Sequence, residues 1–127
     1  MLRSAVIAAL LATSCVLVAT SHSVRHRMTL GSNGEATCHV RWTAPPALQL
    51  RLDNQGPGRI SFVALDKSGI LLDQGELGVG GRSFSWKRAD GEIRLVLRAD
   101  ARGAQTECYF ATSEGLQVSV DKTNAAN

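Results

Sequence analysis

The residues of this chain that could carry chemistry are its three cysteines, Cys15, Cys38 and Cys108. Cys15 follows a short apolar run near the N-terminus, whereas Cys38 and Cys108 each fall on the apolar side of an alternating stretch. Two inward-facing cysteines in an exported domain favour a disulfide, because such a bond persists in an oxidising compartment. Neither has a second Cys or His at a ligand spacing, so we expect no metal site and no cofactor.

Other candidate catalytic groups are few and scattered. His22 and His26 lie in a segment without a sustained period, and His39 alternates outward from a stretch of period two, so the histidines predict no shared site. Ser119 and Lys122 match S-x-x-K in spacing, but they lie at the end of a strand-like segment and not at a helix start. We therefore expect a binding or assembly protein and not an enzyme.

The first 21 residues have the pattern of an export signal, with Arg3 as the positive charge, an apolar run at residues 5–20 and small residues after it. The run is shorter than the roughly 20 residues that a membrane-spanning helix needs. Two processing routes stay open. Residues 11–15 resemble a bacterial lipobox, in which Cys15 becomes the lipidated first residue, whereas cleavage after Ser21 would discard that cysteine. Either route leaves the other two cysteines as a pair.

A chain of 127 residues forms one domain. It divides into a signal peptide at residues 1–14, or 1–21 by the second route, a tether at 15–34, a folded domain at 35–121 and a polar tail at 122–127. Lys and Arg number 14 against 11 Asp and Glu, and the two signs are interleaved. A nucleic-acid surface would instead cluster its basic residues beside stacking aromatics, so we expect no nucleic-acid partner.

From residue 35 onward, apolar side chains recur at every second position and helix signals are absent. Such stretches, separated by turn residues, predict an all-β fold, a single compact antiparallel β-sandwich of about seven to eight short strands. We expect strands at residues 35–42, 48–53, 59–65, 70–72, 84–86, 93–99, 106–110 and 116–120. Residues 54–58 are predicted to turn, and residues 75–81 are predicted to form a glycine-rich loop.

A bridge between Cys38 and Cys108 would join an early strand to a late one across the core. The chain-entropy model gives it a stabilising effect of about 4 kcal/mol. The alternative is a pair of free buried thiols.

Some apolar positions exceed what the alternation requires. Val63 and Leu65 point to the face opposite that of Ile60, Phe62 and Ala64. Residues 70–72, which include Leu71, are apolar throughout. One interpretation is a central strand that is buried on both faces. The other is a groove that accepts an apolar segment of a partner, as a helix or as an added strand. In that case Val63, Leu65 and Leu71 are the candidate partner-binding residues.

The stretch from residue 34 to 54, with its alternating strand, the connection WTAPPA and the strand LQLRLD, resembles the YscW/YbaY family of small bacterial β-sandwich lipoproteins. The segment SFSW at residues 83–86 and the alternating stretch at 93–99 are similar to later strands of that family. These motifs are short, and together they span most of the predicted domain.

The resemblance implies a type III secretion pilotin, which is a lipidated assembly chaperone that binds the C-terminal segment of a secretin subunit and escorts it to the outer membrane. Cys15 would be the lipid site. The residue after Cys15 is Val16 and not the Asp that often retains lipoproteins at the inner membrane. The expected location is therefore the periplasmic face of the outer membrane. The alternative is a secreted or lipid-anchored periplasmic binding module, such as an enzyme inhibitor or a carbohydrate-binding domain.

Overall fold

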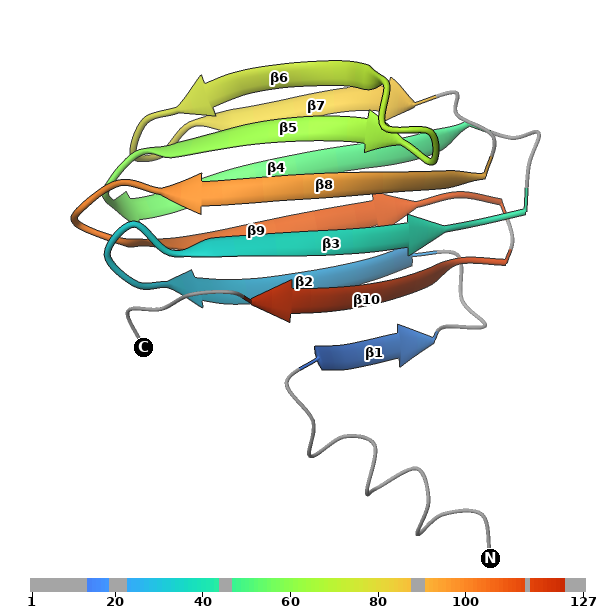
Figure 1. Ribbon diagram of the computed structural model, residues 1–127, viewed down its shortest axis with the longest axis horizontal. Helices are drawn as coiled ribbons and strands as arrows, with labels where there is room; N and C mark the ends of the chain where they lie inside the picture. The colour runs from blue at the N-terminus through green and yellow to red at the C-terminus, as the bar shows by residue number, and fades with distance from the viewer. Residues whose placement is uncertain (1–13, 19–22, 44–46, 88–90, 114, 123–127) are drawn as a thin grey trace, which may run out of the picture.

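The computed structural model describes residues 14–18, 23–43, 47–87, 91–113 and 115–122. In this part of the chain, ten strands form two antiparallel sheets packed face to face, which confirms the predicted all-β sandwich (Figure 1). The predicted signal peptide up to residue 13, the cleavage site after Ser21, the Pro45–Pro46 connection and tail residues 123–127 lie outside the described residues. No described helix is long and apolar enough to cross a membrane.

The two sheets have six and four strands. Sheet A has the spatial order β1 (Ser14–Val18), β10 (Gln117–Lys122), β3 (Glu35–Arg41), β8 (Glu92–Ala99), β5 (Ile60–Asp66) and β6 (Leu71–Leu77). Sheet B has the order β2 (Ser23–Leu30), β9 (Ala104–Ala111), β4 (Leu48–Pro57) and β7 (Arg82–Lys87). In Figure 1, β6 and β7 therefore lie at the top of the molecule, and β1 lies at the opposite edge.

Alternate side chains of both sheets fill the space between them, as period-two patterning requires. Leu95 and Leu97 of β8, Phe110 of β9 and Leu48 of β4 are fully buried, and Leu52 of β4 is almost so. Removing this apolar area from water is the main stabilising contribution, at about 25 cal/mol per Å². All eight strands expected from the alternation are present, although several of them are longer than predicted.

The predicted tether at residues 15–34 is wrong in one respect, because most of it is paired in the sheets. β1 pairs with β10, and β2 pairs with β9 over its whole length. Val24, Met28 and Leu30 of β2 are buried, and the half-buried His26 takes the remaining inward position. The alternation of apolar residues in β2 is interrupted by His26, so the sequence pattern did not predict this strand. The sandwich thus includes residues well before 35.

The turn predicted at residues 54–58 is also wrong, since β4 continues to Pro57 with a bulge between Asn54 and Gly56. The buried side chain of Asn54 explains how the chain continues. Its amide nitrogen donates to the carbonyls of Gly58 and Leu77, both at 2.9 Å, and its Oδ1 accepts from the N–H of Gly56 at 2.9 Å. These bonds satisfy the polar groups that the bulge leaves out of the strand pairing.

Gly75 lies inside β6 and not in a loop, so β6 is longer than the predicted strand at residues 70–72. A Cβ at this position would come within 2.9 Å of the Phe62 ring. The glycine therefore lets β6 pack closely against the aromatic side chain of β5, its partner strand.

Candidate functional site

Large hydrophobic side chains that the described residues expose gather on one side of the sandwich. Their exposed fractions are 62% for Ile70, 49% for Leu71, 37% for Leu72, 62% for Val79 and 53% for Phe84. All five lie in β6, in β7 or in the segments next to them. We call these five residues the apolar edge. Large exposed hydrophobic side chains that gather in one part of a protein mark interaction sites.

β6 and β7 are the outermost strands of sheet A and sheet B, and they contact each other across the gap between the sheets. Among the described strands, neither has a neighbour on its outer side. Their outward N–H and C=O groups can therefore bond to an added strand. The apolar edge combines these backbone groups with exposed apolar side chains.

The three residues predicted to bind a partner lie near this edge. Val63 and Leu65 are half-buried on the outer face of β5, and Leu71 of β6 lies opposite Leu65 in the strand pairing. The structure thus brings Leu65 and Leu71 together, with Val63 two positions away on the same face. Val79 and Phe84 were missed, because Val79 lies in the connection between β6 and β7 and Phe84 faces outward from sheet B, opposite Arg51.

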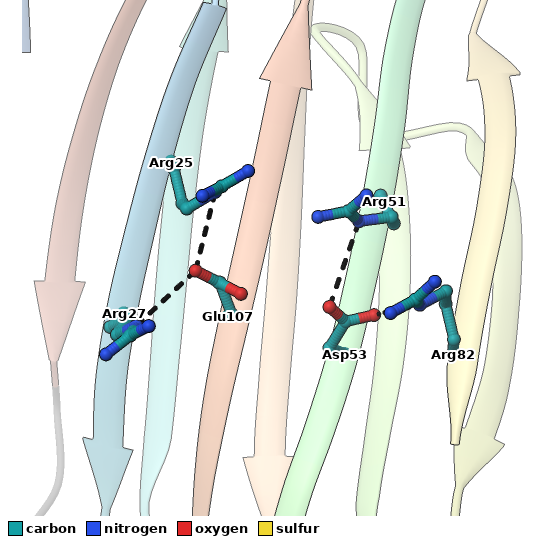
Figure 2. Close-up of polar contacts among 6 residues, drawn as sticks. All are labelled: Arg25, Arg27, Arg51, Asp53, Arg82 and Glu107. Carbon is teal, nitrogen blue, oxygen red and sulfur yellow. Dashed lines mark hydrogen bonds and ion pairs between the residues drawn. The ribbon is translucent and has the colours of Figure 1, made fainter. Parts of the chain in front are cut away.

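A second surface, on the outer face of sheet B, is rich in arginine (Figure 2). Two rows of residues in register cross the four strands β2, β9, β4 and β7. The first row contains Arg25, Tyr109, Arg51 and Phe84, and the second contains Arg27, Glu107, Asp53 and Arg82. We call these eight residues the arginine face. Sequence reasoning missed it, since the rows depend on the pairing of strands far apart in the chain.

Each carboxylate of this face lies between two arginines. Glu107 Oε2 is 3.5 Å from Arg25 Nε and 3.4 Å from Arg27 Nε. Asp53 is 2.8 Å from Arg82 Nε through Oδ1 and 3.8 Å from Arg51 Nε through Oδ2. Figure 2 shows the two clusters on neighbouring strands. The outer arginines offset the repulsion between the two carboxylates, which are directly opposite each other in register.

Tyr109 lies between two guanidinium groups in the first row. The guanidinium carbons of Arg25 and Arg51 are 5.7 Å and 5.1 Å from the centroid of its ring. Cation–π contacts at these distances are favourable, and they hold both arginines over the face.

Cys38 of β3 and Cys108 of β9 are fully buried and meet across the core from opposite sheets. The structure holds both as thiols, linked by a hydrogen bond. That bond, together with burial, raises the pKa of Cys108 well above its ordinary value. The predicted disulfide stays a prediction, since the structure records both cysteines as free.

Cys15, the predicted lipid site, lies in β1 opposite Val120 of β10, and its lipidation stays a prediction. His26 lies opposite Cys108, and its pKa is lowered by burial and then by the charge of Lys122. Within the described ranges, no three His, Cys, Asp or Glu side chains lie close enough together to hold a metal ion.

Comparison with known proteins bears on the fold alone. No family model matches the chain, and no curated protein matches it. Among solved structures, the coconut allergen cocosin is 17% identical with a TM-score of 0.54, over 83% of this chain and 28% of that protein. Procruciferin, the 11S globulin of Brassica napus, is 12% identical with a TM-score of 0.55, over 84% of this chain and 27% of that one.

A bacterial structure, the Yersinia pseudotuberculosis-derived mitogen, is 7% identical with a TM-score of 0.53 and covers 73% of this chain and 87% of its own. The chain thus spans little more than a quarter of cocosin and of procruciferin, and most of the mitogen. At such low identities these proteins share an all-β architecture with this chain. Their activities do not transfer, and the expected pilotin function stays a prediction.

Proposed function

We propose that this protein is an exported binding protein that docks an extended apolar segment of a partner protein along its apolar edge. The observation that carries the proposal is the gathering of exposed large hydrophobic side chains on β6, β7 and their flanking residues, in the described part of the chain. Both strands also end their sheets, so the side chains lie beside backbone groups that can pair with an added strand.

The layout of the edge suits an extended occupant. Ile70 and Leu71 lie at the start of β6, and Val79 follows its end. A strand of this length extends over about 23 Å, at roughly 3.3 Å per residue. Apolar contacts at both ends of such a strand fit a segment that runs along it, with alternate side chains turned towards the sandwich.

The position of Cys15 is compatible with membrane anchoring. Cys15 lies in β1, and β1 and β6 are the two opposite edges of sheet A. A lipid on Cys15 would hold the protein by one edge and leave the apolar edge available. In the form that the YscW/YbaY resemblance implies, the partner is the C-terminal segment of a secretin subunit, and the protein is a type III secretion pilotin at the periplasmic face of the outer membrane.

Leu71→Lys tests the docking edge, and Thr37→Lys is its matched control. Thr37 is half-exposed on the outer face of β3, three strands away from β6 in sheet A. The binding partner in the assay is a synthetic peptide of the C-terminal segment of the secretin subunit from the same genome. We expect Leu71→Lys to weaken its binding at least tenfold. Covering a half-exposed leucine contributes about 1 kcal/mol, and a lysine on an edge strand opposes strand addition.

The two parts of the proposal fail separately. Equal binding by Leu71→Lys and the unchanged protein would contradict docking at the apolar edge. If the unchanged protein does not bind the peptide at all, the secretin is not the partner, and the alternative of another periplasmic binding module is favoured. Unfolding midpoints in urea, measured for both variants, ensure that the comparison is between folded proteins.

A further inference from the structure

The arginine face presents guanidinium groups above its carboxylates. The side chains of Glu107 and Asp53 are only 10% and 14% exposed. Those of Arg25, Arg27 and Arg82 are 58%, 77% and 64% exposed. With four arginines and two carboxylates, the face has an excess of positive charge. A surface that approaches sheet B from outside therefore meets cations first.

The ion pairs leave much of each guanidinium available. In every pair the nitrogen closest to the carboxylate is Nε, at 3.5 Å for Arg25, 3.4 Å for Arg27 and 2.8 Å for Arg82. A guanidinium has five N–H donors, and four of them are on its two terminal nitrogens. The carboxylates thus fix the arginines by their inner nitrogen, and the outer nitrogens can donate to oxyanions such as phosphate.

Apolar side chains lie at the rim of this face. Phe84 is 53% exposed and lies in the same cross-strand row as Arg25 and Arg51. Val79, which is 62% exposed, lies in the connection that leads into β7. Arginines next to exposed apolar side chains match the chemistry of a membrane interface, where phosphates carry negative charge and apolar side chains insert at headgroup level.

We propose that the arginine face is a docking surface for anionic phospholipid headgroups. Arg25, Arg27 and Arg82 donate hydrogen bonds to lipid phosphates. Charge complementarity carries this assignment, since the carboxylates are recessed and the exposed groups are cationic. The proposal goes beyond partner docking, because it orients sheet B against a membrane without any contribution from a lipid on Cys15.

The test uses the full chain with Cys15→Ser, so that no lipid can be attached at that position. Binding is measured by co-sedimentation with vesicles of phosphatidylglycerol and phosphatidylcholine, and with vesicles of phosphatidylcholine alone. A cationic residue near an anionic surface raises affinity about fivefold. We therefore expect Arg25→Gln with Arg27→Gln to weaken binding to the anionic vesicles about 25-fold. Raising the salt concentration should weaken it further, because salt screens the attraction between exposed charges.

The matched control is Arg94→Gln with Arg98→Gln. These two arginines are exposed on the outer face of β8 in sheet A, so the control removes the same net charge from the other side of the sandwich. We expect it to bind as the parent does. If the double variant proves unstable, the single variant Arg25→Gln replaces it, because it keeps the contact of Arg27 with Glu107. Its affinity for the anionic vesicles should fall about fivefold.

Three results would overturn the proposal. Equal losses in the face variant and the control would show an effect of net charge alone. Unchanged binding by the face variant would show that these arginines do not contact lipid. Complete displacement from vesicles by millimolar inorganic phosphate at constant ionic strength would indicate a site for free phosphate and not for a lipid surface.

Discussion

Oxidation of Cys38 and Cys108 to a disulfide should stabilise the domain by about 4 kcal/mol. The two residues are 70 positions apart in the sequence and meet as buried thiols from opposite sheets. In the chain-entropy model, a cross-link that closes a loop of this length lies between the values of about 3 kcal/mol for 15 residues and about 4.7 kcal/mol for 100. The bond forms when the two thiols lose two protons and two electrons to a disulfide-donating oxidant.

Urea unfolding of the oxidised and the reduced protein measures this effect. For an unfolding slope of about 2 kcal/mol per M, the oxidised protein should unfold at a urea concentration about 2 M higher. The variant with Cys38→Ala and Cys108→Ala should not respond to reductant. Cys15→Ser, used as the background in all samples, removes the remaining thiol from the comparison.

The chemical state of the pair is read by alkylation after unfolding. Because both thiols are fully buried, alkylation of the native protein cannot tell a disulfide from a pair of protected thiols. Protein taken from an oxidising compartment is unfolded without reductant in the presence of an alkylating agent, and its mass is measured. Alkylation of both cysteines, or a urea midpoint that reductant does not change, would refute the disulfide.

Two further predictions concern single residues. Glu107→Gln removes the recessed carboxylate that contacts Arg25 and Arg27, so it should lower the free energy of unfolding by about 1 kcal/mol. It should also raise the affinity for anionic vesicles about fivefold, because the arginine face gains net positive charge. Lower affinity in this variant would contradict the charge argument. His26 has a pKa lowered from 6.5 by burial and by Lys122, so the unfolded chain takes up its proton at a higher pH than the folded one. The free energy of unfolding should therefore fall as the pH decreases below about 6.5 and level off beneath the pKa of His26 in the folded protein. The urea midpoint of His26→Gln should vary less with pH over that window. An identical pH dependence in the variant would exclude His26 as the cause.

The alternation of apolar residues predicted most of the fold because side chains of a strand point to opposite faces in turn. It placed Cys38 and Cys108 on inward faces, and both are fully buried. It missed β2, where His26 takes one of the inward positions between Val24 and Met28. An alternating pattern that allows one polar residue at an inward position predicts this strand.

The arginine face could not be predicted, because it depends on how distant strands pair. Arg27 and Glu107 are 80 residues apart in sequence and become neighbours only when β2 pairs with β9. The apolar edge was partly predictable. Residues 70–72 are apolar without interruption. The exposure of Val79 follows from its place in the connection between β6 and β7, and that of Phe84 from its outward orientation on sheet B, which no local pattern encodes.

Hydrogen–deuterium exchange tests the central claim, strand addition at the apolar edge, most directly. Amide exchange is measured along the chain with and without the secretin C-terminal peptide, because an added strand protects the N–H groups that it bonds. The account predicts slower exchange in Leu71–Leu77 of β6 or Arg82–Lys87 of β7, with no change in Gln117–Lys122 of β10. Slower exchange in β10, or none in β6 and β7 when the peptide is bound, would contradict it.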